Sequence, residues 1–201
     1  MNWKIIIFCL LILGSFSIHA QDDALEKRPI ELSFEYQMYP AGMMPGLKIE
    51  VGLGKYYKSS IEGRIAYNRA RRHSWGEHGD ERGGGWGGSV GYKYYILKPM
   101  KGLYVGGRSD VWRLNIDYRD IGEDMTYGTS DDSDFGQSKI WIFQPTVSVG
   151  YKFLFKVGAK DTVIFLTPQV AAGWEYNVKT EGEAVGQGAI GLWGLDIGVR
   201  F

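Results

Sequence analysis

Side chains able to build a hydrolytic centre lie close together at His73, Ser74 and Glu77. A histidine that hydrogen-bonds a serine hydroxyl can act as its general base, and a carboxylate can hold that histidine in place. Neighbouring residues on a strand point to opposite faces, however, so His73 and Ser74 could not act together on one substrate bond if they lay on a strand. We therefore interpret this segment as a polar loop without catalytic residues.

Possible metal ligands occur in two polar segments: His73, Glu77, His78 and Asp80, then Asp132 and Asp134. In the first segment neither a helix nor a hairpin fixes the spacing that a metal site needs. The second segment resembles the start of a calcium loop but lacks the later ligands and the closing glutamate. The sequence therefore predicts solvated loop charges, with no metal and no cofactor.

Three arginines, Arg69, Arg71 and Arg72, stand at the end of an alternating segment. Guanidinium groups form paired hydrogen bonds with phosphate oxygens, so this cluster could contact phosphates at a surface. The whole chain does not favour nucleic acid, because Lys and Arg together number 23 and Asp and Glu together also number 23.

The elements that position these residues are recognised by alternation. From residue 188 to residue 201 every second residue is apolar or small, and the other register ends with Asp196, Gly198 and Arg200. A period of two predicts a strand with two unlike faces. Similar alternation occurs in seven earlier segments, at residues 30–38, 47–54, 61–68, 90–96, 103–118, 141–153 and 164–176.

The connections alternate between short and long. Short turns are expected at 55–59, 98–102 and 155–161, and longer polar loops at 69–88, 119–138 and 177–187, with a first loop bounded by Pro40 and Pro45. Eight strands joined in this way predict an all-β fold, an eight-stranded antiparallel up-and-down transmembrane β-barrel. An even number of strands places both chain ends on one side.

The fifth segment is the least regular. Leu103 and Val105 occupy one register, whereas Trp112, Leu114 and other apolar residues up to Tyr118 occupy the other. A β-bulge within residues 106–110 would bring both groups to the same face.

The content of the polar register indicates which face is inside. It carries charges of both signs, at Glu31, Glu35, Lys48, Glu50, Glu62, Arg64, Lys93, Lys152, Glu175, Asp196 and Arg200. It also carries glycines, at Gly52, Gly54, Gly91, Gly150, Gly173, Gly194 and Gly198. Charges that face one narrow lumen can pair, and glycines make room for large neighbours there. A soluble barrel with its apolar face inward is the alternative.

Aromatic residues near the ends of the segments support the membrane interpretation: Tyr36, Tyr67, Tyr92, Tyr94, Trp141, Tyr151, Trp174 and Tyr176. Such residues form belts at the two membrane surfaces. The mixed charges of the inner register predict a polar plug in the lumen, not an open channel.

The first residues predict a signal peptide. Lys4 precedes an apolar stretch at residues 5–17 and a small-residue cleavage site that ends at Ala20. The stretch is shorter than the roughly 20 residues of a membrane-spanning helix. We expect residues 1–20 to be removed and residues 21–201 to form one barrel domain without cysteine, since Cys9 lies in the leader.

The leader, the alternating segments and the final Leu195-Asp-Ile-Gly-Val-Arg-Phe201 resemble small bacterial outer-membrane barrels of the OmpA/OmpX type. The Ala20-Gln21 junction is similar to leaders common in Bacteroidetes. The resemblance covers the chain from about residue 30. It implies a Gram-negative outer membrane, contact with its lipid and lipopolysaccharide, and recognition of Phe201 by the barrel-assembly machinery. OmpA also has a peptidoglycan-binding domain, but the resemblance covers only the barrel, so we do not expect that anchoring role here.

The expected function is structural or surface-interactive, through the extracellular loops and without enzyme activity, in a protein we expect to be a monomer. A narrow passive pore is one alternative. A lipid A-modifying enzyme is another, but the deacylases of such barrels separate His and Ser by one residue, unlike His73 and Ser74.

Overall fold

The computed structural model describes residues 28–73, 80–119, 135–157 and 162–201. Eight strands account for almost all of them: β1 (Ile30–Tyr39), β2 (Gly42–Leu53), β3 (Ser59–His73), β4 (Asp80–Tyr95), β5 (Gly102–Arg119), β6 (Phe135–Val157), β7 (Thr162–Glu181) and β8 (Gly188–Arg200). No helix among the described residues is long and apolar enough to cross a membrane.

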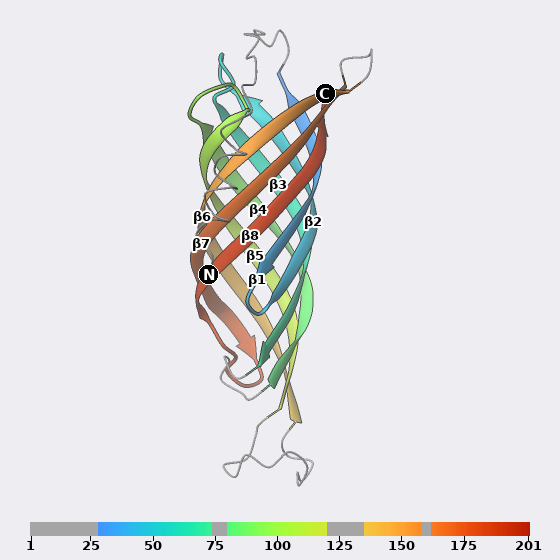
Figure 1. Ribbon diagram of the computed structural model, residues 1–201. Helices are drawn as coiled ribbons and strands as arrows, with labels where there is room; N and C mark the ends of the chain where they lie inside the picture. The colour runs from blue at the N-terminus through green and yellow to red at the C-terminus, as the bar shows by residue number, and fades with distance from the viewer. Residues whose placement is uncertain (1–27, 74–79, 120–134, 158–161) are drawn as a thin grey trace, which may run out of the picture.

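Each strand pairs antiparallel with its neighbour in sequence, and β8 pairs with β1 to close the barrel (Figure 1). Closure leaves no exposed sheet edge. The predicted all-β, eight-stranded antiparallel up-and-down fold is confirmed.

The two ends of the barrel differ. The turn end holds the start of β1, the end of β8 and the connections 54–58 and 96–101, and lies at the top of Figure 1. The loop end holds the β1–β2 turn at 40–41 and the connection 182–187. β5, β6 and β7 have 18, 23 and 20 residues, whereas β1 and β2 have 10 and 12. The long strands extend the wall at the loop end.

Over most of the wall, the alternating residues of each strand point in turn to the outside and to the interior of the barrel. Outward-facing Leu47, Ile65, Val90 and Val147 are each more than 60% exposed, whereas inward-facing residues such as Lys48 are buried. The barrel therefore carries apolar side chains outside and charged side chains inside, the reverse of a soluble barrel.

The strands reach further than predicted at the loop end. Residues 69–73 and 80–88, expected to be loop, belong to β3 and β4, with Arg71 opposite Arg82. The glycine run from Gly83 to Gly88 hides the alternation because glycine has no side chain, but its backbone still pairs on both sides. Similarly, β7 continues to Glu181, so only residues 182–187 of the expected 177–187 loop lie outside strands.

The first loop is also shorter than predicted. Pro45 was expected to bound a loop but lies within β2, opposite Tyr36 of β1. On its other side the ladder with β3 omits Met44 and Pro45. Proline has no N–H to donate, and because the ladder is interrupted at Pro45, no backbone hydrogen bond from this residue is required there.

The predicted bulge in the fifth strand is wrong. β5 pairs without a break with β6 from Gly102 to Arg119 and with β4 from Tyr104 to Arg119. Leu103 and Val105 face outward, but Trp112 and Leu114 face the interior and are 1% exposed. A register shift occurs instead between Trp141 and Ile142 of β6, opposite β7.

Glycine in the inner register makes room for bulky neighbours, as Gly150 illustrates. A Cβ atom added there would lie 2.5 Å from the Tyr104 hydroxyl oxygen and 2.6 Å from its ring. Gly54, which was assigned to the same register, instead lies in the 54–58 connection with φ of +72°.

Substituting Gly150 should therefore destabilise the barrel. We expect G150V to lower the free energy of unfolding by about 1–3 kcal/mol, because the new side chain overlaps Tyr104. The matched control is G107V, since a Cβ at outward-facing Gly107 meets nothing closer than 3.8 Å. Denaturant titration of the refolded proteins measures both, and equal stabilities would contradict this packing.

Candidate functional site

The interior of the barrel contains a continuous network of ion pairs. From the turn end it runs from Arg200 through Glu31, Lys152, Glu50, Lys93, Glu62, Lys48 and Glu35 to Arg108 and Asp110, with Arg64 bound to Glu35 and Asp196 bound to Lys48. Six members are acidic and six are basic. The network is therefore neutral when all its members are ionised, which is the condition for burying so many charges.

Lys48 of β2 occupies the middle of this network. Its Nζ atom lies 2.9 Å from Glu35 of β1 and 3.6 Å from Glu62 of β3, and it also contacts Asp196 of β8. Lys48 is 1% exposed. One ammonium group thus joins four strands, including the two that close the barrel.

Two arginines extend the network toward the loop end. Arg64 and Arg108 approach the same Glu35 oxygen at 2.6 and 2.7 Å, and both donate to the side-chain oxygen of Gln37. Arg108 also pairs with Asp110 at 3.0 Å. Glu35 is thereby held from three directions, with no measurable exposure to solvent.

The structure brings most of the charged residues chosen from the sequence together. Ten of the eleven belong to this network: Glu31, Glu35, Lys48, Glu50, Glu62, Arg64, Lys93, Lys152, Asp196 and Arg200. Glu175 lies apart, paired with Arg72 at 2.7 Å, and Arg72 also meets Glu81.

Sequence reasoning missed four interior charges: Arg72, Glu81, Arg108 and Asp110. Arg108 and Asp110 share their register with Tyr104, so extending the alternation unbroken through β5 would have found them. The assignment of Arg72 to the arginine cluster at the surface is wrong. Arg72 is buried in the barrel, whereas Arg69 and Arg71 face outward.

An aromatic group lies inside the turn end. Tyr95, Met100 and Tyr104 pack together without exposure to solvent. The Tyr95 hydroxyl donates to Glu50 at 2.5 Å, and Lys93 and Lys152 lie 4.7 and 5.0 Å from the ring centroids of Tyr104 and Tyr95. The rings therefore close this end and hold the cations in place.

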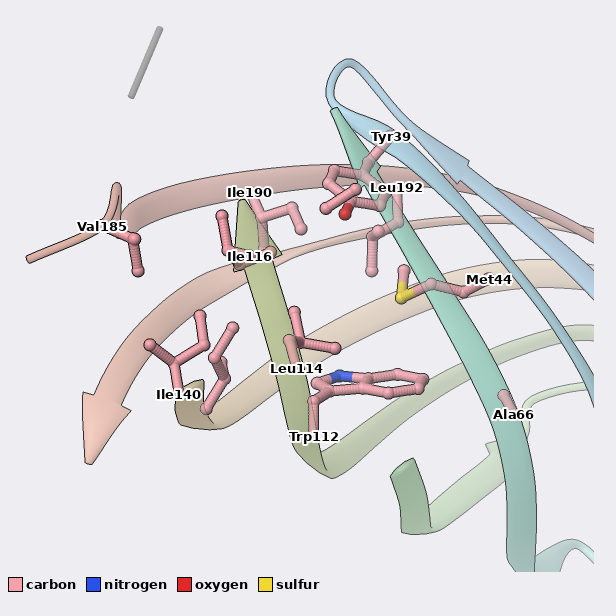
Figure 2. Packing of buried hydrophobic residues seen from close by; sticks show 12 residues of the cluster. Tyr39, Met44, Ala66, Trp112, Leu114, Ile116, Ile140, Val185, Ile190 and Leu192 are labelled. Atoms are coloured by element: carbon pink, nitrogen blue, oxygen red, sulfur yellow. The ribbon is translucent and has the colours of Figure 1, made fainter. Parts of the chain in front are cut away.

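An apolar cluster fills the loop end of the interior, and Figure 2 shows its members pointing toward one another. Its buried members are Tyr39, Met44, Ala66, Ala70, Trp112, Leu114, Ile116, Ile140, Ile142, Val185, Ile190 and Leu192. The 182–187 connection contributes Val185, and the Gly186 carbonyl accepts a hydrogen bond from Arg72 at 2.5 Å. This connection therefore folds against the interior of the barrel.

The candidate hydrolytic and metal residues lie mostly outside the described part of the chain. This holds for Ser74, Glu77, His78, Asp132 and Asp134 and for the side chain of His73. Asp80 is described, and it pairs with Arg82 at 2.6 Å. The described residues contain no group of His, Cys, Asp and Glu that could hold a metal ion.

Removing the central ammonium should leave buried Asp196 without a cation and the network one positive charge short. We expect K48M to lower the free energy of unfolding by about 3–5 kcal/mol. The exposed K179M is the control and should change stability by less than about 1 kcal/mol. In K48M/D196N one carboxylate is also neutralised, and part of the loss should be recovered. Denaturant midpoints measure all three, and a K48M protein as stable as the parent would refute the role of Lys48.

No protein-family model and no curated protein sequence matches the chain. Solved bacterial barrels are similar to it in structure. The N-terminal β-barrel domain of Pseudomonas aeruginosa OprF has a TM-score of 0.43 at 14% identity and covers 87% of this chain and 100% of that one. Neisserial surface protein A (NspA) has a TM-score of 0.39 at 11% identity, covering 86% and 94%. The attachment invasion locus protein Ail of Yersinia pestis has a TM-score of 0.42 at 8% identity, covering 87% and 96%. No residue role is carried over at such low identity.

Proposed function

We propose that this chain is an integral outer-membrane barrel with a closed lumen, which serves a structural role or binds partners through its outer loops. The observation that carries the proposal is the filling of the interior at three successive levels. Aromatic side chains fill the turn end, paired charges the middle, and apolar side chains the loop end. A barrel whose interior is filled in this way is a stable scaffold and a poor channel for ions or solutes.

The outer face of the wall supports insertion in a membrane. Large apolar side chains are exposed on every strand, among them Phe34, Leu47, Val147 and Leu195. In water such a surface would be costly, whereas in lipid it is the required one. A barrel strand needs about 9–11 residues to cross a bilayer, so β1 and β2 are long enough.

If the barrel is inserted in a membrane, an outward-facing charge should lower its stability only within the apolar band of the wall. We expect V147R to lower stability in lipid vesicles by about 2–4 kcal/mol, because its guanidinium would face hydrocarbon. Q137R is the control on the same strand, since Gln137 is exposed at the loop end beside Asp117. Urea titrations in vesicles measure both variants. An equal effect of the two would count against this placement.

The closed interior favours a plug over the narrow pore. The network leaves Lys48, Lys93 and Lys152 each bound to carboxylates, so an ion would have to break buried pairs to pass. At the loop end the Trp112 ring and its apolar neighbours fill the interior beside the buried Arg72–Glu175 ion pair.

Planar-bilayer recording tests the plug. The purified barrel should show no steady single-channel current at about 100 mV, since the paired charges and the apolar cluster lie across the lumen. Urea-unfolded protein added at the same concentration controls for leakage caused by protein adsorption. Reproducible conductance steps from the folded barrel would contradict the plugged lumen and support the narrow pore.

The remaining elements of the proposal concern partners. Phe201, exposed at the end of β8, would be the signal for the barrel-assembly machinery, and a monomer would suffice because closure of β8 on β1 needs no second copy. A surface partner would bind at the connections of the loop end, and a pull-down with the folded barrel would identify it. The lipid A-modifying alternative has no described residue that favours it.

A further inference from the structure

A pocket of about 170 Å³, here called the loop-end pocket, lies between the β1–β2 turn and the start of β8. It exists because β1 is short. The last pair of the β1–β8 ladder joins Met38 to Trp193, and residues 188–192 of β8 continue beyond β1. Exposed Pro40 and Ala189 stand among the lining residues, so the pocket opens to the surface. The full lining consists of Tyr39, Pro40, Ala41, Arg72, Glu175 and residues 186–191.

Glu175 provides a carboxylate in the wall of this pocket. It is 5% exposed, and its Oε2 atom accepts a hydrogen bond from Arg72 at 2.7 Å. Its other carboxylate oxygen, Oε1, is buried and has no hydrogen-bond partner among the described residues. A buried oxygen without a donor is costly. A ligand that brings a donor to Glu175 would therefore gain a charge-assisted hydrogen bond.

The charges around the pocket favour a cationic ligand. Arg72 is the one basic side chain among the described residues that line it. Besides Glu175, this guanidinium donates to the Gly186 carbonyl at 2.5 Å and to Glu81 at 3.4 Å. One guanidinium thus serves two carboxylates and a carbonyl. A ligand anion would have to compete with these groups for Arg72, whereas a ligand cation would complement them.

The rest of the lining limits the size and polarity of the ligand. Tyr39 and Ile190 belong to the apolar cluster of the loop end (Figure 2), and Ala41 packs against it. Gly188 and Gly191 add no side chain, and a Cβ at either position would meet nothing within 4 Å. A cavity of roughly 150 Å³ holds a molecule as small as benzene. The pocket therefore suits a charged group carried on a short apolar stem.

We propose that the loop-end pocket binds a primary ammonium group on a short apolar stem, with the ammonium donating to Glu175. A free amine and the lysine side chain of a surface partner both present such a group. The inference rests on the proposed binding role of the loop end, to which it gives a ligand class. It does not require a closed lumen.

An NMR titration of the isotope-labelled barrel in detergent micelles tests the proposal, with the amide signals of residues 186–191 as the readout. We expect n-butylammonium to shift these signals with a Kd of about 1 mM. n-Butanol has the same stem without the charge, and butyrate carries the opposite charge, so both should bind about tenfold more weakly or less. Equal binding of all three ligands would overturn the cation site.

Blocked lysine, acetylated at its amino end and amidated at its carboxyl end, separates the two sources of the ammonium group. Binding as tight as that of n-butylammonium would support the site and assign it to a partner's lysine side chain. Exclusion of blocked lysine, while n-butylammonium still binds, would support the site as one for a free amine. Absence of binding by both ligands would overturn the proposal.

Three variants locate the site. E175Q removes the carboxylate charge and should weaken binding of n-butylammonium about tenfold. E183Q is the control, because it removes the same charge from an exposed position in the 182–187 connection, and it should bind like the parent. E175Q also disturbs the pair with Arg72, so A41L provides a second change: it enlarges a side chain of the lining and leaves Glu175 intact. A41L should also weaken binding.

Folding of each variant is checked first, since unboiled folded protein should migrate differently from boiled protein on a gel. Equal affinity of E175Q, A41L and E183Q, all folded, would overturn the site. A parent barrel that binds no amine but shows no current in planar bilayers would overturn this inference alone. Conductance steps from a barrel that does bind the amine would instead contradict the plugged lumen and support the ammonium site.

Discussion

The structure depends on charge neutrality within a closed space. Lys48 shows the constraint most directly, because one buried ammonium is shared among Glu35, Glu62 and Asp196 on three neighbouring elements. A buried ion pair gains little net stability, since desolvation offsets most of the Coulomb attraction. Removing one partner is costly nonetheless, because the other charge then stays buried without compensation. The twelve-residue network satisfies this constraint with six charges of each sign.

The polarity of the wall reverses along β5. On β5, Val105 and Val111 are exposed outside while Arg108 and Asp110 are buried, but nearer the loop end Arg113 and Asn115 face outward while Leu114 and Ile116 are buried. The strand itself is regular throughout, so the surroundings and not the backbone explain the change. Hydrocarbon outside requires the first arrangement and water or headgroups the second. At the loop end β5 therefore has the face pattern of a strand in a soluble barrel.

This reversal also explains what the sequence could predict. A period of two identified all eight strands and the strand order, because one face remains apolar over most of each strand. This pattern failed at Trp112 and Leu114, where the apolar residues of β5 change from the outer to the inner face. Keeping all apolar residues on one face required a bulge that the strand does not have. The pattern failed again at Gly83 to Gly88, where glycine leaves nothing to alternate. Ion-pair partners such as Lys48 and Asp196 are 148 residues apart, so only the closed register reveals them.

A charged interior also fixes the register of the sheet, which an apolar interior could not do in a membrane. With hydrocarbon outside and apolar side chains inside, a slip of one residue on β2 would exchange one apolar face for another at little cost. With Lys48 and Glu50 inside, the same slip would turn both charges toward lipid and bring Leu47 and Ile49 among carboxylates. A lysine facing the middle of the bilayer would cost on the order of 2–4 kcal/mol, and a glutamate less. The network thus stabilises the native register chiefly by penalising the alternatives, although it contributes little as a set of attractions.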